Sequence, residues 1–200
     1  MERGRYLVFE GIDGCGKSTQ AARLAGLLDG VLTFEIGATK LGGALRKLVL
    51  NTEYSPSALA EALLIAADRA EHMTEVVIPA LNAGRTVVSD RNGASTIAYQ
   101  GYGRSLDRVL MKTLVEIATQ GVTADLTVLL DIDPALAAQR RSGAADRMER
   151  EAQSFFERVR EGYLAQAAES PDAWLVVDAT LAIDSVSELI DRSLRERGWL

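Results

Sequence analysis

The chain has few of the residues from which disulfides and histidine-based metal sites are built. Among its 200 residues, Cys15 is the only cysteine and His72 is the only histidine. A single cysteine excludes a disulfide within the chain and fits a reducing compartment. Nothing near His72 in the sequence resembles a set of metal ligands or an activated nucleophile, so we expect no functional role for it.

Positive charge is also scarce. The chain has 22 lysines and arginines against 28 aspartates and glutamates, which gives a formal net charge of −6. This balance argues against a nucleic-acid polymer as partner, because contacts along a phosphate backbone need clustered basic side chains. A single nucleotide needs only a local basic patch, so nucleotide binding is not excluded.

No apolar run is long enough to span a membrane, and we recognise no signal peptide. With 48% hydrophobic and 25% charged residues, the composition is that of a globular protein. We therefore expect one cytoplasmic domain over residues 1–200, with no membrane partner.

The most informative stretch is residues 11–18, which fit the pattern G-x-x-x-x-G-K-[ST]. An apolar run at 6–9 precedes it and a helical pattern at 19–28 follows it, which is the context of a phosphate-binding loop. Backbone N–H groups of such a loop surround an anion at the helix N-terminus. We expect Lys17 to reach the β- and γ-phosphates of ATP and Ser18 to bind Mg²⁺. The predicted nucleotide contacts are Gly11, Asp13, Gly14, Cys15, Gly16, Lys17, Ser18 and Thr19. A glycine-rich turn without a ligand is the alternative.

Strands and helices alternate along the rest of the chain. We predict strands at 6–10, 31–35, 85–90, 124–131 and 173–178. We predict helices at 17–28, 55–81, 107–119, 134–141, 148–168 and 182–197, the second beginning with Ser55 as N-cap and Pro56 in the first turn. Gly37, Gly42 and Gly43 punctuate a predicted loop before residues 45–50. Most of the strands are continuous apolar runs, which is typical of a parallel sheet buried on both faces. The predicted fold is α/β, a three-layer phosphate-loop NTPase with a five-stranded parallel sheet and a small lid segment.

The predicted strands at 6–10, 85–90 and 173–178 end in the acids Glu10, Asp90 and Asp178. Ligands of open α/β sheets bind beyond the carboxyl ends of the strands, where such acids can meet Mg²⁺ or a ribose. We expect Asp90 to hold Mg²⁺ together with Ser18, and Arg91 to offer its planar fork to a phosphate. The alternatives are acids that only cap the following turn, or an Asp90–Arg91 pair that only binds itself.

Three further segments carry candidate residues. Ile65 and Arg69 lie four residues apart and share a helix face, although the block 66–72 could equally be solvated surface. The segment 139–147 is rich in arginine and has a Gly-Ala centre, so it could close over a triphosphate or be an exposed loop. The glycine-rich turn 99–104 could present Tyr99 and Arg104 to a planar ligand.

Taken together, the blocks 9–20, 66–72, 90–101 and 146–149 resemble bacterial-type thymidylate (dTMP) kinase over essentially the whole chain. The resemblance implies transfer of a phosphoryl group from ATP to a deoxynucleoside monophosphate with Mg²⁺, a lid at about 140–150, and a homodimer. The catalytic residues that it implies are Lys17, Asp13, Arg91, Arg140 and Arg147. The acceptor contacts that it implies are Asp13, Glu35, Ile65, Arg69, Arg91, Thr96, Tyr99 and Gln100.

The chain departs from the family pattern at three places, all of which we expect on the acceptor side. Phe34 replaces an arginine, Ile65 replaces an aromatic residue that stacks on thymine, and residues 92–94 replace a tyrosine and bulky neighbours. We therefore expect dTMP as acceptor, with a modified pyrimidine nucleotide as the alternative. Three rivals stay open: a kinase for another metabolite, a nucleotide switch, and a homologue that binds ATP without transferring phosphate.

Overall fold

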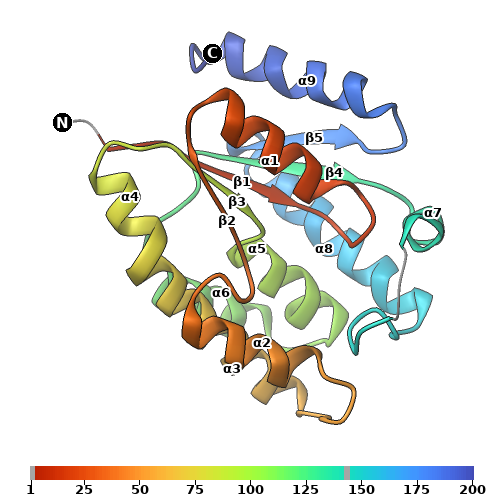
Figure 1. Ribbon diagram of the computed structural model, residues 1–200. Coiled ribbons are helices and arrows are strands. Elements are labelled where there is room, and N and C mark those ends of the chain that lie inside the picture. Colours follow the sequence, from red (N-terminus) through yellow and green to blue (C-terminus); the bar gives the residue numbers. More distant parts are fainter. Residues whose placement is uncertain (1–2, 142–144) are drawn as a thin grey trace.

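The computed structural model describes residues 3–141 and 145–200 and contains a five-stranded parallel sheet (Figure 1). The strands are β1 Tyr6–Glu10, β2 Val31–Phe34, β3 Val87–Asp90, β4 Leu126–Asp131 and β5 Trp174–Asp178. Their order in the sheet is β2-β3-β1-β4-β5, and every neighbouring pair is parallel. The α/β fold and the five parallel strands predicted from the sequence are confirmed.

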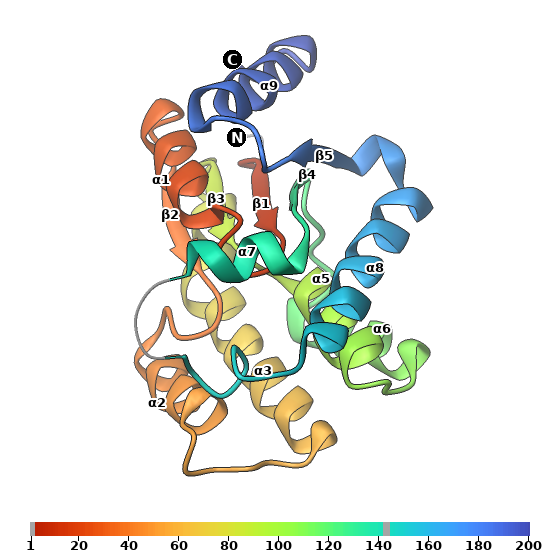
Figure 2. The same ribbon diagram turned by 90° about the vertical axis from the view of Figure 1, so that its right-hand side faces the viewer.

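Helices cover both faces of the sheet. They are α1 Lys17–Leu27, α2 Lys40–Leu50, α3 Ala58–His72, α4 Ile78–Asn82, α5 Gly93–Thr96, α6 Arg108–Thr119, α7 Pro134–Arg140, α8 Gln153–Glu169 and α9 Ile183–Glu196. Figures 1 and 2 show α1 and α9 on one face and α8 on the other, with α2 and α3 below the carboxyl edge. Within the described ranges no helix is long and apolar enough to cross a bilayer.

The register of the sheet brings the strand-end acids to one edge. Phe9 pairs with Asp90 across β1 and β3, and Glu10 pairs with Leu129 across β1 and β4. The first residues of β1 alternate between two buried clusters: Tyr6 packs with helix residues 73–81, whereas Leu7 packs with α1 and β4. Burial on both faces explains why the strand reads as an unbroken apolar run.

Several predicted element boundaries were wrong for local reasons. The helix expected from Ser55 begins at Ala58, because Ser57 is the N-cap and its hydroxyl accepts a hydrogen bond from the Ala60 N–H. That segment is also not one regular helix, because π-helical turns at Met73–Val77 separate α3 from α4. The loop expected around Gly42 and Gly43 is helical, because α2 begins at Lys40 after the Thr39 cap.

Two other predictions placed helix and turn incorrectly. The helix expected from Met148 begins only at Gln153, because Asp146 and Glu149 exchange side chain-to-backbone hydrogen bonds that close a turn. The predicted glycine turn at 99–104 is largely helical, since π-helical turns at Ile97–Gly103 extend α5. Gly103 is tolerated there because its bare Cα packs against Phe155 of α8.

Close packing between α8 and the Ile97–Gly103 turns yields a stability prediction. A Cβ at Gly162 would lie 2.8 Å from the Tyr102 ring, whereas a Cβ at Gly26 of α1 would meet nothing within 4 Å. We expect Gly162→Ala to lower the free energy of unfolding by about 1–3 kcal/mol through overpacking. We expect the matched Gly26→Ala to raise it by about 0.5–1 kcal/mol, because alanine favours a helix. Denaturant unfolding of both variants checks this, and a Gly162→Ala protein as stable as the parent would contradict it.

Candidate active site

The loop between β1 and α1 has the geometry of a phosphate cradle. Gly11 and Gly14 adopt positive φ values of 138° and 94°. A Cβ at Gly14 would stand 2.4 Å from the Ala137 carbonyl oxygen, so the loop tolerates only glycine there. Lys17 is buried, and its ammonium donates to the Ile12 carbonyl at 3.1 Å, which holds the charge over the loop. The loop can therefore surround an anion with backbone N–H groups and one fixed ammonium.

Ser18 and Asp90 meet at the end of the loop. The Ser18 hydroxyl donates to the Asp90 carboxylate at 2.5 Å, which joins the start of α1 to the end of β3. A hydroxyl and a carboxylate are hard oxygen donors that suit Mg²⁺. The described residues contain no group of three or more His, Cys, Asp or Glu side chains that could hold a metal. A magnesium ion would therefore complete its coordination with substrate phosphates and water.

Arg91 lies at the centre of the site and does not pair with its neighbour Asp90. Its guanidinium donates to Asp13 at 2.6 Å and to the Gly11 carbonyl at 3.0 Å. The residue itself adopts a left-handed φ of 77°, unusual for a side chain-bearing residue and typical of functional sites. Burial alone would raise the pKa of Asp13, but Arg91 and Lys17 outweigh it and hold that pKa well below its usual range. Asp13 is therefore a fixed anion in the site.

The sequence analysis did not select Tyr163 and Ser95, which bond to the Arg91 guanidinium. Tyr163 of α8 bonds to the Arg91 guanidinium at 3.1 Å, to Ser95 at 2.8 Å and to Glu10 at 2.9 Å. Burial raises the pKa of the Glu10 carboxyl, and the nearby Arg91 only partly offsets this effect. Tyr163 carried no sequence signal, because it stands in an ordinary helix pattern far from the loop in the chain. Ser95 lies within the block 90–101, but nothing in the pattern of that block singles it out.

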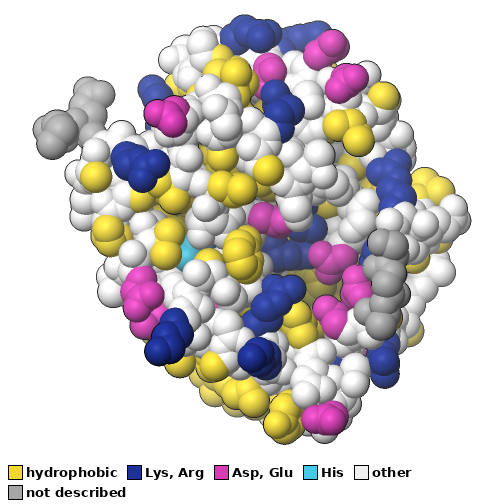
Figure 3. All heavy atoms as spheres, in the orientation of Figure 1, with side chains coloured by type: hydrophobic (Ala, Val, Ile, Leu, Met, Phe, Trp, Pro, Cys, Tyr) yellow, Lys and Arg dark blue, Asp and Glu magenta, His cyan; other side chains and the backbone are white. Residues whose placement is uncertain are grey.

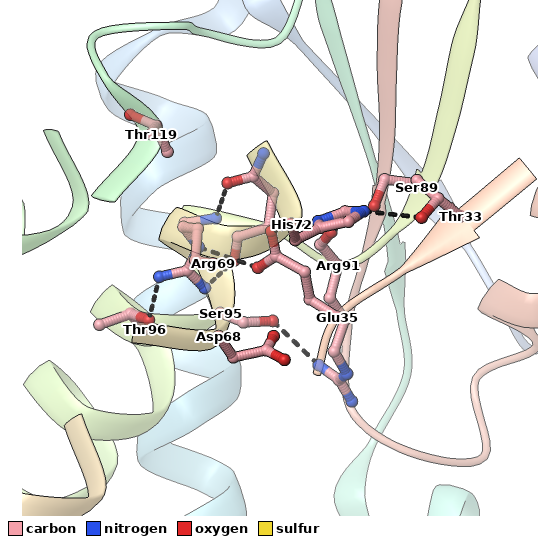
Figure 4. Close-up of polar contacts among 12 residues, drawn as sticks. Thr33, Glu35, Asp68, Arg69, His72, Ser89, Arg91, Ser95, Thr96 and Thr119 are labelled. Atoms are coloured by element: carbon pink, nitrogen blue, oxygen red, sulfur yellow. Dashed lines mark hydrogen bonds and ion pairs between the residues drawn. The ribbon is translucent and has the colours of Figure 1, made fainter. Parts of the chain in front are cut away.

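Arg69 of α3 is almost completely buried, with a side chain only 1% exposed. It donates to Glu35 at 2.8 Å, to the Thr96 hydroxyl at 2.8 Å and to the Asn92 carbonyl at 3.1 Å (Figure 4). His72 bonds to the other Glu35 oxygen at 3.0 Å. Arg69 and His72 belong to a buried polar layer, so the alternative of a solvated surface is wrong for both.

Asp68 belongs to the same layer. One of its oxygens, Oδ1, accepts a hydrogen bond from the Gly37 N–H at 2.9 Å, while Oδ2 is buried without a partner among the described residues. Burial, and then the nearby Glu35 carboxylate, raise the pKa of Asp68 to about 6. The hydrogen bond between Gly37 and Asp68 connects the short segment after β2 to α3.

One cavity of about 700 Å³ joins these groups. Figure 3 shows it as a hollow with basic and acidic side chains near the centre of the view. The predicted residues that line it are Asp13, Gly14, Gly16, Lys17, Ser18, Thr19, Glu35, Ile65, Arg69, Arg91, Thr96, Tyr99, Gln100 and Arg140. Gly11, Cys15, Asp90 and Arg147 are absent from this lining. Lining residues that sequence reasoning did not select include Ile36, Arg46, Ser95 and Arg141.

The arginines of the predicted lid have different partners. Arg140 donates to the Ala179 carbonyl at 2.7 Å, and the Arg141 guanidinium lies 5.1 Å from the centre of the Phe156 ring. Arg147 is turned away, since it donates to the Val49 carbonyl at 2.7 Å and pairs with Glu61. The Gly-Ala centre predicted for the lid lies outside the described residues.

Arg104 forms an ion pair with the buried Glu61 carboxylate, which also pairs with Arg147. It pairs with Glu61 at 3.1 Å and with Glu151 at 2.5 Å, and it does not line the cavity. These partners give Arg104 a structural position and leave it no contact with the cavity where a ligand would lie. Glu61 can balance two guanidinium groups because it is an ionised carboxylate with two acceptor oxygens.

The three departures from the family pattern fall in different places. Ile65 lines the large cavity, whereas Phe34 is 46% exposed and does not. The Asn92 side chain bonds to the Tyr6 hydroxyl, and residues 92–94 line a second cavity of about 340 Å³ beside α6. The expectation that all three lie around one acceptor space is therefore wrong for Phe34 and for residues 92–94, although the Asn92 carbonyl accepts a hydrogen bond from Arg69.

The family model for thymidylate kinase matches residues 9–190. The chain belongs to the thymidylate kinase family. It is 46% identical to the thymidylate kinase of Prochlorococcus marinus strain SARG, over 96% of this chain and 93% of that one. It is 47% identical to that of a Synechococcus species, over 97% of each chain. Among solved structures of this family, thymidylate kinase from Ehrlichia chaffeensis matches with a TM-score of 0.79 at 31% identity, over 96% of this chain and 99% of that chain.

The raised pKa of Asp68 predicts a pH dependence of stability. An acid whose pKa is higher in the folded state contributes most stability below its unfolded pKa, near 3.9, and loses that contribution as pH rises through about 6. Asp68→Asn removes this titration. We therefore expect the free energy of unfolding of the parent, relative to Asp68→Asn, to fall by about 2–3 kcal/mol between pH 4 and pH 7. Denaturant unfolding of both proteins across this range measures the difference, and parallel pH profiles would contradict the assignment.

Proposed function

We propose that this protein transfers the γ-phosphoryl group of ATP to dTMP and releases ADP and dTDP. The observation that carries the proposal is the single cavity in which the Lys17 loop and the Arg91–Asp13 pair lie opposite Arg69 and Ile65. A donor site and an acceptor site must share one enclosed space, because direct transfer requires the two phosphates to approach in line. The names of the relatives, all thymidylate kinases, support dTMP as the acceptor.

The donor side consists of the phosphate loop and an adjoining cavity of about 310 Å³. Cys15, Arg140 and residues after β5, among them Ala179, Leu181 and Ile183, line this adjoining cavity. The loop amides and Lys17 would bind the phosphates, and the adjoining cavity would take the base of ATP. Ser18 and Asp90 would hold Mg²⁺, which neutralises phosphate charge when bound.

The acceptor side would bind a nucleoside monophosphate through two kinds of group. Arg91 and Arg46 present guanidinium groups suited to its phosphate, and Asp13 keeps Arg91 oriented. Ile65, Arg69 and Gln100 line the remainder of the space and would contact the base. Thr96 and Tyr99 line the same region.

In the reaction, an oxygen of the acceptor phosphate forms a bond to the γ-phosphorus, and the bond from that phosphorus to the β,γ-bridging oxygen breaks. The electron pair of that bond leaves with ADP. Lys17 and the loop amides balance the charge on the transferred group, and Arg91 holds the attacking oxygen in place. Arg140 and Arg141 line the cavity and add positive charge beside the loop. Arg147 would join them only after leaving Glu61.

A coupled assay of ADP release across a panel of monophosphates tests the proposal. We expect dTMP to be preferred by orders of magnitude over purine nucleotides, and other pyrimidine deoxynucleotides to follow it. Equal or higher kcat/KM with another monophosphate would overturn dTMP as the acceptor. ATP hydrolysis without an acceptor product would instead indicate a nucleotide switch.

Lys17→Ala tests the donor side in the same assay. We expect kcat to fall by several orders of magnitude, because the charge on the transferred group loses its fixed ammonium. The fold should survive, since the Lys17 ammonium contributes hydrogen bonds only within the loop, to the Ile12 carbonyl and the Cys15 sulfur, and one long ion pair to Asp13. Circular dichroism verifies the fold, and near-normal turnover in a folded Lys17→Ala protein would refute the mechanism.

We further propose that the enzyme is a homodimer that pairs through α3 and α6. Leu63 of α3 and Ile117 of α6 are 52% and 70% exposed, and Figure 3 shows apolar side chains along the lower edge near α2 and α3. The two helices pack against each other, so their exposed residues form one apolar surface. Burial of such a surface against a second copy removes it from water.

Sedimentation velocity tests the dimer. We expect the parent to sediment with twice the mass of one chain and Ile117→Lys to sediment as a monomer, because a buried lysine at the interface would be unpaired. Leu27→Lys is the matched control, since Leu27 is 51% exposed on α1, away from the proposed interface. A parent protein that sediments as a monomer would refute the pairing.

A further inference from the structure

The segment that follows β2 forms part of the cavity wall and is fixed by contacts with three side chains, those of Arg69, Arg46 and Asp68. We call residues 35–39 the acceptor loop, because Glu35 and Ile36 line the cavity on its proposed acceptor side. Glu35 binds Arg69, Arg46 donates to the Ile36 carbonyl at 2.7 Å, and the Gly37 N–H donates to Asp68 at 2.9 Å. The first two contacts involve residues that line the cavity themselves, whereas Asp68 does not line it.

The position of the Asp68 carboxylate is energetically unfavourable. Its carboxylate is buried beside that of Glu35, and Oδ2 has no hydrogen-bond partner among the described residues. A buried carboxylate with an unpaired oxygen destabilises a fold compared with an apolar side chain of similar size. Packing is also tight, since a Cβ on Gly42 of α2 would stand 2.3 Å from Oδ1. An aspartate at this place therefore contributes little to stability and calls for another explanation.

The side-chain hydrogen bond that Asp68 makes within the described part of the chain, with the Gly37 N–H, suggests that explanation. Gly37 has a φ of 110° and lies against the Arg46 side chain, so its N–H orients the turn that carries both Ile36 and the approach to α2. Asp68 and Arg69 are consecutive on α3 and are directed about 100° apart around the helix axis. Arg69 can therefore face the cavity while Asp68 faces the loop.

We propose that Asp68 is a positioning residue for the acceptor nucleotide: its bond to the Gly37 N–H fixes the acceptor loop against α3, which places Ile36 and Arg46 at the cavity. This inference rests on the proposed function for its substrate, since it assigns Asp68 to acceptor binding and not to ATP binding. Asp68 acts through the loop and touches no substrate.

Steady-state kinetics with dTMP and ATP test the role. We expect Asp68→Ala to raise the KM for dTMP about tenfold or more, the loss that corresponds to a hydrogen bond to a charged group. The KM for ATP should stay within about twofold, because the acceptor loop meets donor-side Asp90 through a backbone bond, from the Glu35 N–H to the Asp90 carbonyl at 3.0 Å, which Asp68→Ala leaves in place. Asp68→Asn keeps an oxygen that can accept from Gly37, so it should restore most of the dTMP affinity.

Asp107→Ala is the matched control. Asp107 also accepts a backbone N–H through its carboxylate, at 2.8 Å from Leu110, but it caps α6 outside the cavity. We expect this variant to lose stability without a change in the KM for dTMP. An Asp68→Asn protein as impaired as Asp68→Ala, or equal rises in both KM values for Asp68→Ala, would overturn the proposal.

Amide hydrogen exchange without substrate separates this inference from the proposed function. Peptides covering residues 35–39 should exchange faster in Asp68→Ala than in the parent and in Asp68→Asn, while peptides covering 11–18 should not change. Unchanged exchange in the acceptor loop would overturn the positioning role even if dTMP is the substrate. Should the parent fail to phosphorylate dTMP, faster loop exchange would still support the role of Asp68 in fixing the loop, and the proposed function alone would fall.

Discussion

The ion pair between Arg91 and Asp13 is the contact on which the site depends. It joins the end of β3 to the phosphate loop, and the same guanidinium reaches Ser95 and Tyr163 behind it. The Arg91 side chain is only 16% exposed, so removal of Asp13 would leave its charge largely uncompensated in surroundings of low polarity. Arg91 keeps its left-handed backbone conformation because the hydrogen bonds of its side chain hold it in place. The Arg91 guanidinium therefore contacts both the phosphate loop and the proposed acceptor side of the cavity.

A second polar layer, centred on Arg69, gives the acceptor side its shape. Glu35, Thr96 and the Asn92 carbonyl give each of the three nitrogens of the buried Arg69 guanidinium a hydrogen-bond partner. Asp68 and His72 extend the layer to the acceptor loop and to β2. The arrangement is rigid where the base would lie, and this rigidity suits selection of one acceptor by shape and hydrogen bonding.

Local patterns predicted most of the architecture and the position of the phosphate loop between β1 and α1. The phosphate loop was recognisable because glycine is required at positions of positive φ, and a lysine and a serine must follow at fixed spacing. The strands were recognisable because burial on both faces demands continuous apolar runs. Helix boundaries failed where a side chain decided them, as at the Ser57 cap and the Asp146–Glu149 turn. Such hydrogen bonds compete with the helix over only a few residues and leave a weak pattern.

By itself, the sequence determined the strand order along the chain, the phosphate loop and the pairing of Ser18 with Asp90, because each follows from short-range spacing and from the common edge of parallel strands. Only the tertiary structure decided which partner each arginine takes. Arg91 binds Asp13 and not Asp90, and Arg147 binds Glu61 outside the cavity. These choices depend on which helix faces meet, and residues far apart in the chain set them, so no local pattern records them.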